Sequence, residues 1–337
     1  MNNKVSIIVP IYGVENYIAQ CLHSLFRQTF QYIQYVFVDD CTKDNSIAIL
    51  EKIIEEYPNR KENITIIRKR KNEGLPAARK TGLKHASGDY IIHIDSDDWI
   101  EYGMIEAMYN KVISDNFDIV WCDYYEDYST QSKYIDTSVN SIDKTTILKR
   151  LLNINKPLHS GVWNKLVKRE IYFDNNIIFP NANQMEDFVV TTQTIYYAKK
   201  FGYLNRALYH YRINQDSLCR DPRRMNKIIL ESYENFLMST TFLLNKMGKN
   251  IIALEPELSN YTNYIKLTIM LSPETRDVKK LSELYPESNE SIFNKDFKSP
   301  FYHKIFLLGA TKNISFYFFV IDNIRSLKNK FNGIRIK

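Results

Sequence analysis

Three carboxylates end an apolar run at Asp95, Asp97 and Asp98. The run itself, residues 90–94 (YIIHI), predicts a buried strand, and ligands of open α/β sheets bind at the carboxyl ends of strands. Because neighbouring carboxylates repel one another, we expect a cation there. Oxygen ligands favour a hard divalent ion, Mg²⁺ or Mn²⁺, that completes its coordination with substrate phosphates. The structural alternative is an acidic turn that caps the next helix.

Chemically capable residues also follow the other predicted strands. Pro10 is expected to stop the first strand and to leave Tyr12 beside the crevice. Asp39 and Asp40 end the second strand, where they could form a capped turn or bind a base and ribose. Arg79, near the start of a helix, could meet a diphosphate through charge-assisted hydrogen bonds. Carboxylates at two separate strand ends suit a nucleotide with a metal better than a structural ion pair.

Alternating strand-like and helix-like segments must position these residues. Strands are predicted at 4–9, 35–38, 64–67, 90–94 and 119–123, and helices at 15–27, 44–57, 76–86 and 100–114. Strands that alternate with helices of about a dozen residues indicate βαβ units and a mostly parallel sheet.

The pattern changes after residue 124. Residues 124–141 are polar and Tyr-rich and predict a long loop or an inserted hairpin. Further segments are predicted as helices at 146–153 and 186–199 and as a strand at 203–212. Helical spacing dominates from residue 223. We therefore expect an α/β domain over 1–220 and a C-terminal helical region over 221–337.

Composition narrows the class of protein. The chain has 337 residues, 44% of them apolar, which is ordinary for a soluble protein with a large core. Its 4 cysteines form no CxxC pair and favour a reducing cytoplasm over a zinc cluster or a disulfide framework. No secretory leader is evident at the N-terminus. A net charge of +6 is too small to indicate nucleic acid as a partner.

The C-terminal stretch is basic and aromatic. Its longest apolar run, residues 314–321, is too short for a bilayer span of about 20 residues. Residues 322–337 contain five basic side chains against the single acid Asp322. Such a helix could lie on an anionic membrane surface, which would make the protein peripheral on the inner face of the membrane, or could dock with a solvated basic end.

Three segments together resemble a known family: residues 4–30 (KVSIIVPIYGVENYIAQCLHSLFRQTF), 35–46 (YVFVDDCTKDNS) and 72–99 (NEGLPAARKTGLKHASGDYIIHIDSDDW). In order and spacing they are similar to the nucleotide-sugar-binding half of the family 2 glycosyltransferases. The resemblance is strong over residues 4–125 and weaker to about 220. It implies a GT-A type α/β sandwich and a nucleotide-diphosphate sugar donor, often UDP-linked.

The resemblance also implies roles for the acidic residues. Asp95-Ser96-Asp97 corresponds to the family's DxD-type motif. Asp40 would read the base, with Asp39 beside it. Asp97 and Asp98 would contact ribose and metal, with Asp95 supporting them.

Two later segments, residues 161–172 (GVWNKLVKREIY) and 183–193 (NQMEDFVVTTQ), are similar to the family's acceptor side. They imply that Asp187 is the catalytic base and Glu186 its neighbour; the alternative is that both only favour the positive end of a helix. Arg212, in a segment similar to one that closes over the donor, could touch the diphosphate. Trp163 is an acceptor platform or a core residue, and His159 has no role.

These expectations describe a metal-dependent, inverting glycosyltransferase. It would move a sugar from a nucleotide-diphosphate donor to a hydroxyl of a glycan or lipid-linked oligosaccharide, in capsular, exo- or cell-wall polysaccharide synthesis. A non-catalytic sugar-nucleotide-binding or scaffold protein is one alternative. A nucleotidyltransferase is another, although the first turn lacks a Gly-rich triphosphate loop.

Overall fold

The computed structural model describes residues 3–155, 158–213, 224–272, 284–295 and 297–311. The basic stretch predicted to lie on a membrane surface is outside these residues. The chain divides into two compact units: residues 1–151 with 157–218, and residues 152–156 with 219–337.

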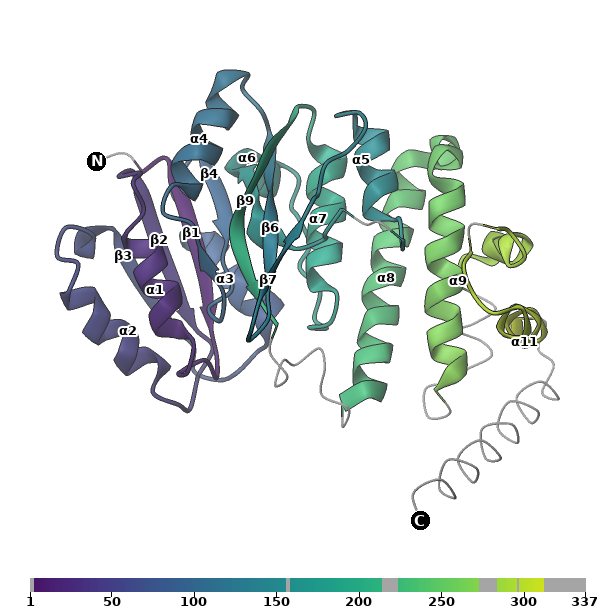
Figure 1. Ribbon diagram of the computed structural model, residues 1–337, viewed down its shortest axis with the longest axis horizontal. Helices are drawn as coiled ribbons and strands as arrows, with labels where there is room; N and C mark the ends of the chain where they lie inside the picture. Colours follow the sequence, from purple (N-terminus) through teal and green to yellow (C-terminus); the bar gives the residue numbers. More distant parts are fainter. Residues whose placement is uncertain (1–2, 156–157, 214–223, 273–283, 296, 312–337) are drawn as a thin grey trace, which may run out of the picture. The chain divides into compact units, whose positions relative to one another are not determined.

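A parallel half-sheet forms from the apolar runs near the N-terminus. It contains β1 (Val5–Ile11), β2 (Ile33–Asp39), β3 (Ile64–Arg68) and β4 (Tyr90–His93), in the spatial order β3-β2-β1-β4. Every residue of β1 and β4 is buried, as expected for parallel strands covered on both faces. The connecting helices are α1 (Ile18–Phe26), α2 (Ser46–Glu55) and α3 (Leu75–His85) (Figure 1).

The other half of the sheet is mixed. It contains β5 (Trp99–Ile100), β6 (Ile119–Asp127), β7 (Ser132–Ile135), β8 (Lys165–Lys168) and β9 (Phe201–Arg212), and the order runs on as β4-β8-β6-β9-β5, with β7 beside β6. β8 is antiparallel to both β4 and β6, whereas β9 is parallel to β6. The expected mostly parallel pairing therefore holds only for the first half. For residues 124–141 a loop or a hairpin was expected, and the hairpin is observed, because β6 and β7 pair as antiparallel strands.

Pro10 lies inside β1 and does not stop the strand. It stands opposite Val38, and pairing continues to Ile11. Ile8, two residues earlier and therefore on the same side of the strand, accepts a hydrogen bond from the Ile94 amide beyond β4 (2.9 Å). The paired part of β4 ends opposite Ile8. The missing N–H of Pro10 thus faces a side where the ladder has already ended, so the proline is tolerated.

The remaining helices of the first unit are α4 (Met104–Ser114), α5 (Lys144–Leu151), α6 (Arg169–Asp174) and α7 (Glu186–Tyr197), with short 3-10 turns at Lys61–Asn63 and Val162–Asn164. In the second unit the described residues form α8 (Met225–Met247), α9 (Glu255–Leu271) and α11 (Phe301–Thr311), with 3-10 turns at Gly248–Leu254 and Pro286–Ser291. Within the described ranges, no helix is both long and apolar enough to cross a membrane.

Candidate active site

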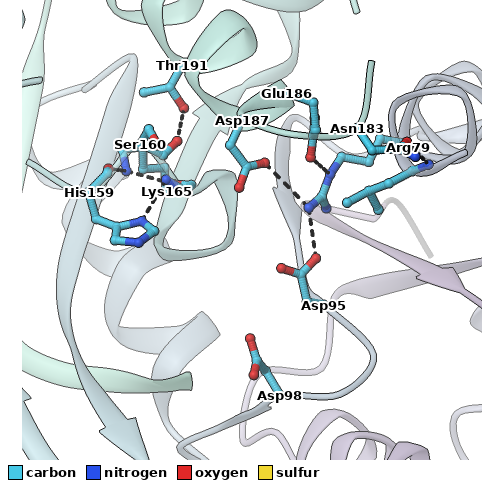
Figure 2. Close-up of polar contacts among 12 residues, drawn as sticks. Arg79, Asp95, Asp98, His159, Ser160, Lys165, Asn183, Glu186, Asp187 and Thr191 are labelled. Atoms are coloured by element: carbon cyan, nitrogen blue, oxygen red, sulfur yellow. Dashed lines mark hydrogen bonds and ion pairs between the residues drawn. The ribbon is translucent and has the colours of Figure 1, made fainter. Parts of the chain in front are cut away.

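A buried arginine joins three segments that are far apart in the sequence. Arg79 of α3 has no exposed surface, and its Nε donates to Glu186 Oε1 (2.6 Å). Its Nη2 donates to Asp95 Oδ1 (2.8 Å) and lies 3.4 Å from Asp187 Oδ1 (Figure 2). Asp95 follows β4, and Glu186 and Asp187 form the first turn of α7. The geometry therefore corrects one expectation: Arg79 orients carboxylates and has no free surface for a diphosphate.

The charges in this cluster depend on one another. Burial opposes the charge of Arg79, but Asp95, Glu186 and Asp187 hold the pKa of the guanidinium well above its usual range. Burial and then Glu186 raise the pKa of Asp187 well above its usual value, whereas Arg79 and Lys165 act in the opposite direction. A carboxylate with a raised pKa is a better proton acceptor once ionised, and the two cations favour that ionised form.

A second contact joins the starts of α3 and α7. The amide of Leu75 donates to Asn183 Oδ1 (3.0 Å). Gly74 has φ +91°, and a Cβ at this position would lie 2.6 Å from the same oxygen. Met185, just before α7, also has a left-handed backbone, with φ 59°. The base candidate is therefore presented by a loop that is pinned against α3.

The acidic turn after β4 contains one closed and one open carboxylate. Asp98 is 1% exposed; it accepts hydrogen bonds from the Tyr209 hydroxyl (2.6 Å) and the Arg212 amide (2.7 Å). Both of its oxygens are thus used to hold β9, and the expected metal contact by Asp98 is not supported by the geometry. Asp97 is partly exposed, and among the described residues no side chain donates to its carboxylate.

A divalent ion fits the open carboxylate. Burial and then Asp95 raise the pKa of Asp97 to about 6, so a bound cation would favour the ionised carboxylate that burial disfavours. Within the described part of the chain, no group of three His, Cys, Asp or Glu side chains could hold a metal alone. Ligation by one or two carboxylates, with substrate phosphates supplying further oxygens, is the usual mode for Mg²⁺.

Arg212 closes this turn from β9. Its Nε donates to the Asp97 carbonyl (2.8 Å), and its Nη2 donates to Gln20 Oε1 (2.5 Å). Its guanidinium also lies over the Tyr17 ring, 5.2 Å from the centroid. Arg212 was expected near the donor phosphates. In the structure it contacts the DxD-type turn.

At the end of β2, the two acidic residues have different roles from those expected. Asp40 is 3% exposed and accepts hydrogen bonds from the amides of Glu73 (3.1 Å) and Gly74 (2.8 Å). It also pairs with Lys69 (2.8 Å), so it holds a loop and has no oxygen left for a base. The carboxylate of Asp39 accepts only one hydrogen bond from the described residues, from the Thr42 amide (2.8 Å). Asp39 therefore replaces Asp40 as the candidate for base contact, and Tyr12 lies 47% exposed at the end of the neighbouring strand.

Of the two alternatives for Trp163, the core residue holds and the acceptor platform does not. It is 1% exposed. Its ring packs against Tyr124, Tyr209 and Tyr211, with centroid separations of 4.9, 4.2 and 5.6 Å. No face is left for a sugar, because aromatic neighbours cover the indole.

Sequence reasoning missed Lys165, which lies near Asp187. Its Nζ donates to the carbonyls of His159 (2.6 Å) and Gly161 (2.7 Å) and to Asn164 Oδ1 (2.8 Å). Burial lowers the pKa of Lys165 to about 7, and Asp187 acts in the opposite direction. The only hint in the sequence was a lysine inside the mostly apolar run VWNKLV.

Both the sequence and the fold are similar to those of known proteins. The model of glycosyl transferase family 2 matches residues 6–173. Glycosyltransferase GlyA of Streptococcus pneumoniae is 32% identical over 65% of this chain and 32% of its own length. The uncharacterized glycosyltransferase EpsJ of Bacillus subtilis is 31% identical over 68% of this chain and 67% of its own. The minor teichoic acid biosynthesis protein GgaB of Bacillus subtilis is 30% identical over 64% of this chain and 23% of its own.

The fold also matches a solved structure. The crystal structure of Staphylococcus aureus TarS 1–349 in complex with UDP-GlcNAc aligns with a TM-score of 0.60 at 19% identity, over 96% of this chain and 92% of that one. The expected GT-A type fold with a C-terminal helical region is thereby confirmed. The family model and the identity to EpsJ lead to one conclusion: the chain belongs to glycosyltransferase family 2.

Proposed function

We propose that this chain is an inverting glycosyltransferase that moves a sugar from a UDP-linked donor to a hydroxyl of a glycan or lipid-linked oligosaccharide. The observation that carries the proposal is the cluster of Asp187, Arg79 and Asp95, which brings the base candidate to the DxD-type turn. The UDP-GlcNAc complex of TarS supports the donor class, and the name of GgaB supports a role in surface polysaccharide synthesis.

The chemistry requires one proton acceptor and one site of charge compensation. The acceptor hydroxyl attacks the anomeric carbon while the bond from that carbon to the diphosphate oxygen breaks. Asp187 takes the hydroxyl proton, and the diphosphate leaves with the electron pair. Because attack and departure occur on opposite faces, the anomeric configuration inverts and no covalent enzyme intermediate is needed.

Charge compensation falls to the turn after β4. Asp97, with substrate phosphates, would hold a divalent ion, Mn²⁺ or Mg²⁺, which when bound supplies positive charge for the departing diphosphate. Arg212 keeps the turn in place through the Asp97 carbonyl. Asp39 would contact the base, and Arg79 and Lys165 oppose the burial that raises the pKa of Asp187.

The test separates catalysis from binding. Asp187→Asn should lower turnover of UDP-GlcNAc by about 10²- to 10⁴-fold, because a general base typically contributes that much, while UDP binding measured by calorimetry is kept. Asp89→Asn is the matched control, since that carboxylate only pairs with Lys4 at the surface. Full turnover by Asp187→Asn would remove Asp187 from the mechanism. UDP binding by the natural chain without turnover of any nucleotide sugar would favour the scaffold alternative.

A further inference from the structure

A loop beside Asp187 fixes the tautomer of a histidine that the proposed mechanism does not use. The amide of Gly161 donates to His159 Nδ1 (2.9 Å). Because Nδ1 accepts, the hydrogen of the neutral ring is on Nε2. A side chain at residue 161 is excluded, since a Cβ would lie 2.8 Å from His159 Nδ1 and 2.4 Å from Trp163 Nε1.

The same loop is locked against the helix that carries the base. Lys165 binds the carbonyls of His159 and Gly161, and Thr191 Oγ1 donates to the Ser160 carbonyl (2.6 Å) (Figure 2). Thr191 lies four residues after Asp187 on α7, so the two share a helix face one turn apart. His159 is thus held on the Asp187 side of the site.

The imidazole is a hydrogen-bond donor and not a proton carrier. Burial, and then Lys165, lower the pKa of His159 to about 3, so the ring is neutral throughout the physiological range. The ring contacts Trp163 in a tilted and Tyr124 in a T-shaped arrangement, at centroid distances of 4.8 and 5.3 Å. The residue is still partly exposed, and no described residue accepts a hydrogen bond from Nε2.

We propose that His159 Nε2–H donates a hydrogen bond to a hydroxyl of the acceptor sugar while that sugar presents its reactive hydroxyl to Asp187. This inference rests on the proposed function. The acceptor is favoured over the donor because the loop is anchored to α7 and Lys165, next to the base, whereas the donor phosphates belong to the turn of Asp97 and Arg212. His159 is therefore a specificity residue for the acceptor.

Two substitutions separate the two hydrogen bonds of the imidazole, the one accepted at Nδ1 and the one donated from Nε2. His159→Asn keeps an acceptor for the Gly161 amide at the Nδ1 position but loses the distal donor. His159→Gln keeps a donor at the reach of Nε2 but loses the contact with the Gly161 amide. His85→Asn is the control, because that histidine is exposed at the end of α3.

The assay uses UDP-GlcNAc as donor and octyl β-D-glucoside, octyl β-D-galactoside and octyl N-acetyl-β-D-glucosaminide as acceptor probes. We expect His159→Asn to raise the acceptor KM by about two- to tenfold, the effect of one neutral hydrogen bond, at every pH between 6 and 8. His159→Gln should stay within about twofold of the natural chain. Neither should change the donor KM or the acceptor-independent hydrolysis of UDP-GlcNAc.

If His159→Gln raised the acceptor KM more than His159→Asn did, the inference would be overturned. A purely structural role needs the contact with the Gly161 amide, which only Asn retains. A raised donor KM would move the contact to the transferred sugar and also overturn it. A natural chain that neither hydrolyses nor transfers would instead refute the proposed function, and this inference with it.

Discussion

At the scale of residues, the site is built from pairs of adjacent acids whose members do different work. Asp40, Asp98 and Glu186 are each at most 3% exposed and bind backbone amides, a tyrosine hydroxyl or Arg79. Their neighbours Asp97 and Asp187 are partly exposed, and Asp39, 9% exposed, has a carboxylate with a single hydrogen bond from the described residues. One acid of each pair thus holds the surrounding structure, through backbone amides for Asp40 and Asp98 and through Arg79 for Glu186, and the other is the candidate for chemistry.

This division explains which site residues could be predicted. Acidic pairs are visible in the sequence at the ends of two strands and at the start of one helix, and the structure brings the pair of α7 and the turn after β4 together around Arg79. Which member points inward depends on the path of the loop, and that path is set by partners far away, such as the Gly74 amide for Asp40. The choice between a platform and a core position for Trp163 could not be made for the same reason, because its covering rings come from β6 and β9.

Arg79 gives a test at this scale. Arg79→Met would leave three crowded carboxylates without their shared cation, so we expect a loss of about 3–5 kcal/mol in the free energy of unfolding, together with loss of turnover. Urea unfolding and initial rates measure the two effects. Arg68→Met is the control: it removes a surface pair with Glu51 and should cost no more than about 1 kcal/mol. Equal costs for the two variants would contradict the shared-cation interpretation.

At the scale of elements, the strength of the local pattern decided what could be predicted. The apolar runs of β1, β2 and β4 and the amphipathic helices between them carry clear periodicity, and they were expected close to their observed bounds. β8 was missed because Lys165–Lys168 has only two apolar residues and two lysines. Its strand character comes from pairing with β4 and β6, which a local pattern does not contain.

The contact between α3 and α7 gives a test at this scale. Gly74→Ala should lower stability by more than about 1–2 kcal/mol, because a left-handed backbone is unfavourable with a side chain and the new Cβ meets Asn183 Oδ1. Turnover should fall too, because Asn183 belongs to the loop that precedes Asp187. Gly13→Ala is the matched control: φ is +69° there, but a Cβ meets nothing within 4 Å, so only the backbone cost applies. If both variants lose equal stability, the Asn183 contact does not position α7.

At the scale of the whole molecule, the two units share one unusual feature, a buried lysine held by neutral oxygens. Lys165 lies in the first unit, and Lys266 of α9 lies in the second. Lys266 is fully buried, and its Nζ donates to Asn289 Oδ1 (2.8 Å) and Ser288 Oγ (2.9 Å). Burial lowers its pKa to about 7, although Glu287 acts in the opposite direction. Each unit therefore carries a group whose charge opposes folding.

The sign of the resulting pH effect can be derived. Between pH 7 and 10.5, the ordinary pKa of a lysine, an unfolded chain keeps a proton on Lys266 that the folded chain has released. Stability therefore rises with pH across this window, by at most about 1.4 kcal/mol per pH unit for one group. From pH 7 to 9 the gain from Lys266 should be about 2 kcal/mol.

Lys266→Met should remove this gain from the second unit alone. All 3 tryptophans, Trp99, Trp121 and Trp163, lie in the first unit, so their fluorescence reports that unit, whereas circular dichroism at 222 nm also follows α8 and α9. Urea unfolding at pH 7, 8 and 9 should show the natural chain gaining stability over Lys266→Met by dichroism as pH rises. Lys227→Met, at an exposed lysine, should follow the natural chain at every pH. Parallel pH curves for the natural chain and Lys266→Met would mean that Lys266 keeps its ordinary pKa, and that the oxygens of Ser288 and Asn289 fully compensate the buried charge.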